Sequence, residues 1–403
     1  MCIGIYGGTF DPIHLGHIRA AEAAVAALQL DRLLLVPAGI PPHKQVSSMS
    51  AAPQQRLEMV SLACEQIQLD TGCPTEASTL ELLRRGASYT CDTVTALQKQ
   101  YPGEELWLLM GTDMFLSFLN WRCPEAIVQR VNLGVFRRYK QSLENLTEQA
   151  EKIQRQLGRV RIQAIPLPEV TELSSTQIRG ELLQQGKSQG LLPQIQGYIW
   201  REHLYGTHLN LKQLTLEQLR PIALSLLKAK RMAHVLGTEQ AAAALARRWG
   251  ENEEEARRAA LLHDCAKRLD RKQQLKMAEH YGLPVDEVER EEPGLLHAKN
   301  GAALAKELFG INDRIYWAIY WHSTGKENMN RLEKILYLAD YIEPSRNFPE
   351  VGYLRQETDK GLDYGMVAGL RNTIEDTLRR GKTVHENSRK ALEYLEQHSG
   401  ETT

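Results

Sequence analysis

The sequence predicts an α/β domain built on a mainly parallel sheet, followed by an all-α domain, and three observations support this fold class. The chain has 403 residues, and at ~150 residues per domain this length favours two or three domains. Up to about residue 200, short β-rich runs alternate with helical patterns, which is typical of stacked βαβ units. From Leu216 onward the strand signature fades and amphipathic helical windows follow one another.

The first domain is expected to span residues 1–203 and the second residues 215–403, with 204–214 as a connector that lacks clear periodicity. Strands in the first domain are predicted at 2–6, 32–37, 105–110, 131–137 and 160–166. Its helices are predicted at 15–29, 54–69, 90–100, 142–157 and 174–185. Helices in the second domain are predicted at 216–228, 231–248, 253–268, 297–309, 312–322, 329–342 and 361–380.

Composition and charge narrow the classes of function. With 42% hydrophobic and 25% charged residues, the chain has the composition of a soluble globular protein. Its net charge of −1 lacks the basic surplus of proteins that grip nucleic acid through phosphate contacts. No apolar run approaches the ~20 residues of a membrane helix, and the six scattered cysteines do not form a disulfide framework. We therefore expect a cytoplasmic protein with no nucleic-acid or membrane partner, and a homo-oligomer stays open.

The first candidate site lies at the start of the chain, where a strand ends in Gly7 and Gly8 and a helix begins near His14 and His17. Glycine lets backbone N–H groups approach a phosphate, and a helix N-terminus adds positive partial charge. The two imidazoles, three residues apart, can donate hydrogen bonds to phosphoryl oxygens during phosphoryl or nucleotidyl transfer. A tight turn with surface histidines remains an alternative, and so does a metal site, although no third ligand lies at helical spacing.

Further candidates are spread over the first half. Lys44 follows a rigid Pro-Pro turn and can reach a polyphosphate, or it is simply solvated. Asp113 follows the 105–110 strand, at the end of a sheet where ligand sites lie. The segment Ser174-Ser175-Thr176 opens a helix with Arg179 one turn in, so it either binds an anion or is an ordinary N-cap. An aromatic ring pocket is expected around Tyr89, Thr90 and Trp121, although Trp121 alone would more often be core.

The run GGTFDPIHLGH resembles the signature of the nucleotidyltransferase superfamily that carries the (T/H)-x-G-H motif. The whole segment 1–203 resembles bacterial nicotinate-nucleotide adenylyltransferases, with further matches at 41–44, 89–93, 111–113 with Trp121, and 174–179. The resemblance implies attack of the nicotinate mononucleotide phosphate on ATP, with Mg²⁺, giving the deamido-dinucleotide and pyrophosphate. It implies that His14 and His17 are catalytic and that the substrates are bound by Gly7, Gly8, Thr9, Phe10, Lys44, Tyr89, Thr90, Gly111, Asp113, Trp121, Ser174, Ser175, Thr176 and Arg179. Thr9 stands where serine is at least as common in that family, and it keeps the hydroxyl.

In the second half, widely spaced segments supply His and Asp to an all-α core: His234, the pair His263-Asp264, His297, His322 and Asp340. Ala256, Ala260, His263, Asp264 and Lys267 are expected to share one face of the 253–268 helix. Polar ligands on core-facing stripes need partners, because burying an unpaired carboxylate or imidazole is costly. A metal cluster is one solution, although each histidine taken singly is more often a satisfied core or surface residue.

The order H…HD…H…H…D resembles the HD-domain metal-dependent phosphohydrolases. The segment of about 216–390 is most similar to bacterial symmetrical bis(5′-nucleosyl)-tetraphosphatases, which implies cleavage of diadenosine tetraphosphate to two ADP. The resemblance implies two metal ions, with iron the expected element, held by His234, His263, Asp264, His297, His322 and Asp340, with Asp264 bridging and catalytic. Lys267 is implied in catalysis and Arg346 in binding substrate phosphates, unless Arg346 is a solvated charge after a helix end. Imidazole and carboxylate ligands also suit Mn or Zn.

Several alternatives stay open. Related transferases use phosphopantetheine or choline phosphate as the acceptor, and the preference for nicotinate over nicotinamide is not defined. HD proteins also cut deoxynucleotide triphosphates or guanosine polyphosphates, and a regulatory module without turnover is a further possibility. The complete ligand set and Lys267 favour an enzyme.

Overall fold

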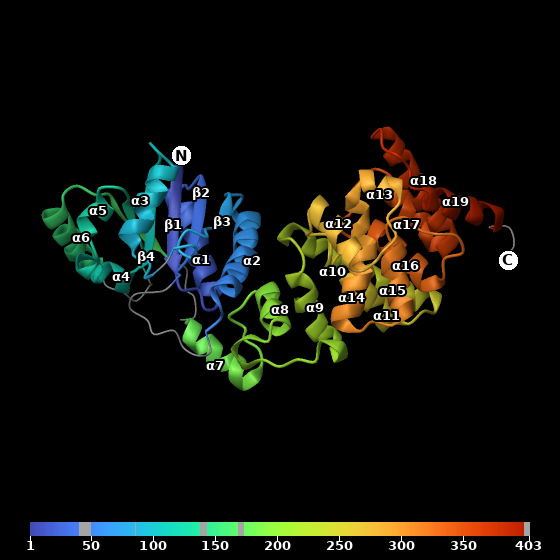
Figure 1. Ribbon diagram of the computed structural model, residues 1–403, viewed down its shortest axis with the longest axis horizontal. Coiled ribbons are helices and arrows are strands. Elements are labelled where there is room, and N and C mark those ends of the chain that lie inside the picture. The colour runs from blue at the N-terminus through green and yellow to red at the C-terminus, as the bar shows by residue number, and fades with distance from the viewer. Residues whose placement is uncertain (40–49, 85, 138–142, 168–172, 399–403) are drawn as a thin grey trace. The chain divides into compact units, whose positions relative to one another are not determined.

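The computed structural model describes residues 1–39, 50–84, 86–137, 143–167 and 173–398. It divides into two compact units, Met1–His208 and Leu209–Thr403. Within the described residues, strands occur in the first unit alone and the second unit consists of helices (Figure 1). The predicted fold class, an α/β unit followed by an all-α unit, is therefore confirmed. Among these residues no helix has both the length and the apolar character needed to cross a membrane.

The described part of the first unit forms a six-stranded sheet in the order β3-β2-β1-β4-β5-β6, and all neighbouring strands run parallel. The strands are β1 (Cys2–Gly8), β2 (Arg32–Pro37), β3 (Thr75–Ala77), β4 (Glu105–Gly111), β5 (Asn132–Arg137) and β6 (Ile162–Pro166). The strand order reverses between β1 and β4, where Ile5 pairs with Leu34 on one side and Leu108 on the other. In open α/β sheets, ligands bind at the carboxyl ends of the strands that flank such a reversal.

Side chains that alternate along each strand build one hydrophobic core on each face of the sheet. On β2, Leu33 and Leu35 enter one core, and Leu34 and Val36 enter the other. The first core is closed by α1 (Leu15–Leu28), α2 (Pro53–Thr71), α7 (Ser175–Gln185) and α8 (Pro193–Arg201). The second core is closed by α3 (Thr90–Gln100), α4 (Thr112–Leu116), α5 (Pro124–Val128) and α6 (Leu143–Leu157).

Five strands were predicted near their observed positions, and the strand that was missed is β3. With three residues at the edge of the sheet, β3 is too short to show a period-two pattern. Helices α4, α5 and α8 were also missed. The stretch expected to be an unstructured connector contains two short 3₁₀ turns, η2 (Leu204–Gly206) and η3 (Leu211–Gln213).

The second unit is a set of packed helices, among which α10 packs against both α11 and α16. Several of its helices begin with a side-chain cap; for example, Asn330 accepts the Glu333 N–H at 3.0 Å. The helices are α9 (Leu216–Ser225), α10 (Ala229–Trp249), α11 (Glu253–Leu262), α12 (Arg271–His280), α13 (Glu287–Glu291), α14 (His297–Phe309), α15 (Asp313–Trp321), α16 (Arg331–Ile342), α17 (Val351–Lys360), α18 (Leu362–Arg379) and α19 (Glu386–His398), with a 3₁₀ turn, η4 (Pro293–Leu296), before α14.

Helices α12, α13, α17 and α19 of this unit were not predicted, and one predicted helix has the wrong end. The helix expected over 253–268 ends at Leu262, so His263, Asp264 and Lys267 do not share a helix face with Ala256 and Ala260. Beyond Leu262 the chain tightens into turns with three-residue spacing, in which the Lys267 N–H donates to the Asp264 carbonyl at 2.8 Å. The tighter turns continue the periodic pattern of the sequence, which is why the pattern alone did not reveal the helix end.

Candidate active sites

The two glycines that end β1 differ in their surroundings: Gly7 is open and Gly8 is packed against a ring. A Cβ on Gly7 would meet nothing within 4 Å, whereas a Cβ on Gly8 would lie 2.9 Å from the Phe10 ring. The Phe10 side chain is buried, so any contact of this residue with a substrate has to come from its backbone. Gly7 therefore offers an open backbone at the carboxyl end of β1.

The loop between β1 and α1 is fastened by residues that the sequence did not single out. Arg56 donates to the Thr9 carbonyl at 2.7 Å and to the Ala38 carbonyl at 2.8 Å. The buried carboxylate of Asp11 accepts the Tyr205 hydroxyl at 2.7 Å and the Ala51 N–H at 3.0 Å. These hydrogen bonds tie the loop between β1 and α1 to the rest of the unit.

His14 and His17 lie against each other at the start of α1, with ring centroids 3.7 Å apart. The His14 backbone N–H donates to Nδ1 of His17 at 3.3 Å. Because Nδ1 of His17 is an acceptor, its Nε2 carries the proton and can donate to an oxygen of a ligand. Burial of His14 lowers its pKa to about 4, so this imidazole is neutral at physiological pH. Neither histidine belongs to the groups of possible metal ligands found among the described residues.

Other predicted residues of the first half lie at the same edge of the sheet. Gly111 and the exposed Asp113 follow β4, the other strand at the reversal. Tyr89 precedes α3, and the Arg122 guanidinium lies over its ring at 4.3 Å from the centroid. Trp121 is half-buried against Phe118, with ring centroids 5.3 Å apart. Lys44 lies outside the described residues.

The Ser174–Arg179 segment makes contacts within the protein. Ser174 is an N-cap whose hydroxyl accepts the Gln177 N–H at 3.1 Å, and the Ser175 hydroxyl donates to the Pro12 carbonyl at 3.0 Å. Arg179 donates to the Asp11 carbonyl at 2.6 Å and to the Thr176 hydroxyl at 3.2 Å. The ordinary-cap interpretation accounts for Ser174, and Ser175 and Arg179 tie α7 to the loop before α1.

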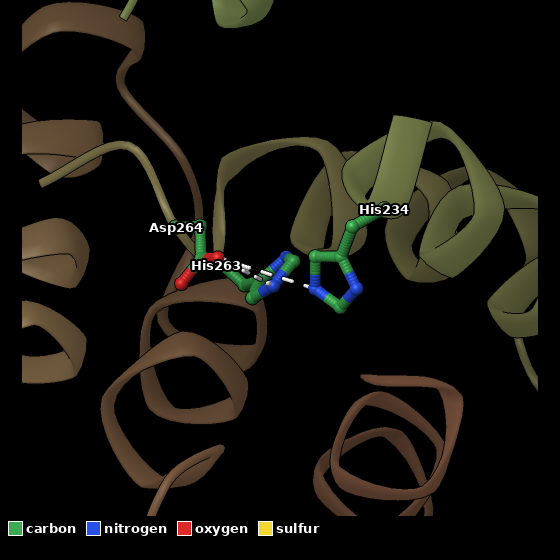
Figure 2. Close-up of side chains that lie close together, drawn as sticks. All are labelled: His234, His263 and Asp264. Carbon is green, nitrogen blue, oxygen red and sulfur yellow. Dashed lines mark ion pairs between the residues drawn. The ribbon is translucent and has the colours of Figure 1, made fainter. Parts of the chain in front are cut away.

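The second site brings together the His and Asp residues predicted to be metal ligands. His234 comes from α10, His263 and Asp264 from the end of α11, and the remaining three from α14, α15 and α16: His297, His322 and Asp340. Figure 2 shows that the imidazoles of His234 and His263 and the Asp264 carboxylate point toward one another. Nε2 of His234 lies 2.9 Å from Asp340 Oδ1, and Nε2 of His297 lies 3.3 Å from Asp264 Oδ1.

All four imidazoles are oriented through Nδ1. In three of them Nδ1 donates to the carbonyl three residues earlier: His263 to Ala260 at 2.6 Å, His297 to Gly294 at 2.7 Å and His322 to Ile319 at 2.6 Å. Nδ1 of His234 donates instead to Glu343 at 3.0 Å. With the proton on Nδ1, the Nε2 lone pair of each ring faces the centre. Nε2 of His297 and Nε2 of His322 are thus 3.2 Å apart.

These residues fit a metal site. The ligand atoms of His234, His263 and Asp264 lie within 4.8 Å of one another, and so do those of Asp264, His297 and His322 and those of His263, His322 and Asp340. Asp264 is common to the first two of these three groups, as expected for a bridging carboxylate. Three buried atoms have no hydrogen-bond partner: Nε2 of His234, Nε2 of His263 and Oδ1 of Asp264. A cation among them would supply what hydrogen bonding does not.

The protonation states agree with metal binding. Burial would raise the pKa of Asp264, but His263 and His297 hold it well below its usual range. Burial similarly opposes ionisation of Asp340, and His234 and His263 hold its pKa well below normal. Burial lowers the pKa of His322, so this ring is neutral. A neutral His322 imidazole beside the ionised Asp264 and Asp340 carboxylates is the combination that a metal requires of its ligands.

Three cationic side chains surround the cluster. The Lys267 ammonium lies 3.0 Å from Nε2 of His297, and Arg346 donates to Asp340 Oδ1 at 2.8 Å, so Arg346 is not a solvated charge. The Arg231 guanidinium contacts Asp264 Oδ2. The sequence prediction missed Arg231 as a site residue, although it lies one helical turn before His234, a position that could have drawn attention.

A second group of possible ligands, Asp286, Glu289 and His385, does not fit a metal. Nδ1 of His385 accepts the Asn387 N–H at 3.1 Å, so its proton is on Nε2, which faces Asp286 at 2.8 Å. The Asp286 carboxylate is therefore placed to accept the Nε2 proton of His385, and the ring offers no lone pair to a cation.

Comparisons with known proteins agree with this division of the chain. A model of the cytidylyltransferase-like family matches residues 5–181, and a model of the HD domain matches residues 231–345. A probable nicotinate-nucleotide adenylyltransferase of Neisseria meningitidis (serogroup C / serotype 2a, strain FAM18) is 39% identical over 204 residues, which cover 50% of this chain and 96% of the relative. A probable nicotinate-nucleotide adenylyltransferase of Shewanella sp. (strain MR-4) is 37% identical over 218 residues, 51% of this chain and 99% of the relative.

A solved structure of a predicted HD superfamily hydrolase involved in NAD metabolism, from Clostridium acetobutylicum, is 35% identical, with a TM-score of 0.45. The match covers 46% of this chain and 99% of the chain in that structure. Fold and sites thus define a nucleotidyltransferase-type α/β unit followed by an HD domain. The chain belongs to the nicotinate-nucleotide adenylyltransferase family through its N-terminal half.

Proposed function

We propose that residues 1–203 transfer the adenylyl group of ATP to nicotinate mononucleotide, giving the deamido-dinucleotide and pyrophosphate. The observation that carries this proposal is one short run at the sheet reversal that holds both an open backbone at Gly7 and an Nε2 donor on His17. The acceptor phosphate attacks the α-phosphorus of ATP, and the bond to the pyrophosphate oxygen breaks. His17 donates a hydrogen bond to the phosphoryl oxygens, on which negative charge develops. Mg²⁺ brought with ATP would neutralise the leaving pyrophosphate.

The choice of acceptor is supported by the relatives and by the aromatic wall. The curated relatives matched by this half are named nicotinate-nucleotide adenylyltransferases. Tyr89 and Trp121 are both partly buried against the same hydrophobic core, and we propose that their rings bind the pyridine. A phosphopantetheine acceptor has no such need for an aromatic pocket, whereas choline phosphate could also use aromatic faces, so the relatives carry the choice against choline phosphate.

For residues 215–403 we propose metal-dependent hydrolysis of a nucleoside polyphosphate, specifically the symmetrical cleavage of diadenosine tetraphosphate. The carrying observation is the set of buried ligand atoms without partners, on His234, His263 and Asp264. Bound metal ions, for which we propose iron, would supply Lewis-acid chemistry for phosphoanhydride hydrolysis. Lys267, Arg231 and Arg346 provide three cationic groups at the edge of the cluster, which suits a chain of several phosphates.

A panel assay on the intact chain tests both proposals. The purified protein is analysed for metal and then offered ATP with nicotinate or nicotinamide mononucleotide, and separately diadenosine tetraphosphate, deoxynucleotide triphosphates and guanosine polyphosphates. We expect deamido-dinucleotide from the first set and ADP alone from diadenosine tetraphosphate. Faster cleavage of a deoxynucleotide triphosphate would overturn the substrate assignment, and a metal-loaded chain that turns over no member of the panel would favour a regulatory module.

A further inference from the structure

One histidine of the metal cluster is supported differently from the other three. His263, His297 and His322 each use the backbone carbonyl three residues earlier, because each lies at the end or the beginning of a helix. His234 lies inside α10, where the backbone carbonyls are occupied by helical hydrogen bonds. Its Nδ1 therefore needs an acceptor from elsewhere in the fold, and Glu343, at the end of α16, supplies a carboxylate at 3.0 Å.

The Glu343 carboxylate is itself held by hydrogen bonds and close packing. It is fully buried, and it accepts the Ser345 hydroxyl at 2.6 Å and the Ser345 N–H at 2.7 Å. Gly237, one turn after His234 on α10, leaves the space that the carboxylate occupies, because a Cβ there would lie 2.4 Å from Glu343 Oε2. A carboxylate hydrogen-bonded to a ligating imidazole fixes its tautomer and makes its other nitrogen a stronger electron donor.

The opposite end of the cluster has a competing cation. Nε2 of His297 is 3.0 Å from the Lys267 ammonium and 3.2 Å from the Ser323 hydroxyl. A metal ion held by Asp264, His297 and His322 would have to displace the ammonium from an imidazole ligand. At the position formed by His234, His263 and Asp264 the nearby cation is the Arg231 guanidinium, which contacts Asp264 Oδ2, while Nε2 of His234 and Nε2 of His263 have no hydrogen-bond partner.

We propose that Glu343 is a positioning residue that makes the two metal positions unequal, so that the position formed by His234, His263 and Asp264 fills first. The position formed by Asp264, His297 and His322 fills second and more weakly. This inference rests on the proposed metal-dependent hydrolase, and it adds an order of loading and the residue that sets it.

The test is a Mn²⁺ titration of the intact, metal-stripped chain, followed by electron paramagnetic resonance of the free ion and by metal analysis after dialysis. The wild type is expected to show two classes of site whose dissociation constants differ by at least tenfold. Glu343→Gln keeps the size of the side chain, but its amide NH₂ must face either His234 Nδ1 or the Ser345 N–H, both of which are donors. We expect the tighter class to weaken about 10–100-fold and the weaker class to stay within about threefold.

The matched control is Glu333→Gln, which changes a second buried carboxylate, at the start of α16. Glu333 accepts the Asn330 N–H at 2.8 Å and is not one of the cluster residues. It should leave both classes unchanged. A second pair uses helical glycines. Gly237→Ala should weaken the tighter class because its Cβ displaces Glu343, while Gly352→Ala, where a Cβ meets nothing within 4 Å, should not. Circular dichroism checks that each variant keeps its helices.

The outcomes separate this inference from the proposed function. A chain that binds no Mn²⁺ overturns the metal-dependent hydrolase and the inference with it. One class of equal sites in the wild type, or two classes that Glu343→Gln leaves unchanged, overturns the loading order alone. A larger loss in the weaker class than in the tighter one also contradicts the assignment.

Discussion

The two candidate sites are built in opposite ways. The N-terminal site is made by one continuous stretch, in which the open backbone at Gly7 and the Nε2 donor of His17 stand at the carboxyl edge of a sheet. The C-terminal site is made by side chains from five helices or helix ends whose buried ligand atoms face one another. The first site stabilises charge with fixed donors, whereas the second concentrates so many acceptor atoms that a cation is needed to stabilise it.

This difference predicts how each site fails. Replacing Asp264 with Asn should have the largest effect, because this carboxylate belongs to two of the three ligand groups in the cluster and is fully buried. We expect metal affinity to fall more than about 100-fold and hydrolysis to be lost, with adenylyl transfer by the same sample unchanged. Metal content per chain and the two assays measure this. Retained hydrolysis would refute the assigned centre.

His17→Ala should remove one donor from the other site. Deleting a single preorganised donor to a developing oxyanion costs about 10²–10³ in kcat, so adenylyl transfer should fall by that factor while hydrolysis is unaffected. His208→Ala, which removes an exposed histidine of the same unit, is the control. Loss of both activities in His17→Ala would show that the sites are not independent.

His14 extends the contrast to pH. Its pKa of about 4 in the folded protein is below the ordinary 6.5, so between these values the unfolded chain binds a proton that the folded chain does not. Stability should therefore be complete above pH 6.5 and decrease as the pH falls toward 4, with about 2 kcal/mol lost at pH 5. Hydrogen exchange of the β1 amides in the wild type and in His14→Asn measures the loss. An identical pH dependence in the two proteins would contradict the burial of a neutral imidazole.

The same contrast explains what the sequence could predict. The glycine turn, His14 and His17 are local, so one short run of residues was enough to predict the site. The order of the five His and Asp segments identified the metal cluster, but not the contacts around it. Arg231, Glu343 and the Asp11–Tyr205 bond depend on which side chains tertiary packing brings together, and residues such as Tyr205 and Asp11 are far apart in the chain. The helix end at Leu262 was missed because tighter turns preserved the apolar pattern.

The smallest predicted effect tests whether the N-terminal site depends on distant fastening. Tyr205→Phe removes the hydroxyl that donates to the buried Asp11 carboxylate. Because Asp11 Oδ1 keeps the Ala51 N–H, the cost should lie at the low end for an unsatisfied buried acceptor, about 1 kcal/mol. Thermal unfolding of the intact chain should show this loss, with a reduction of a few fold in adenylyl transfer because the loop before His14 is less firmly held. Tyr101→Phe, whose hydroxyl accepts from the exposed Gln100, is the control. Unchanged stability together with unchanged transfer would mean that Arg56 and Arg179 hold the loop without help from Tyr205. The N-terminal site would then not depend on the Tyr205–Asp11 hydrogen bond.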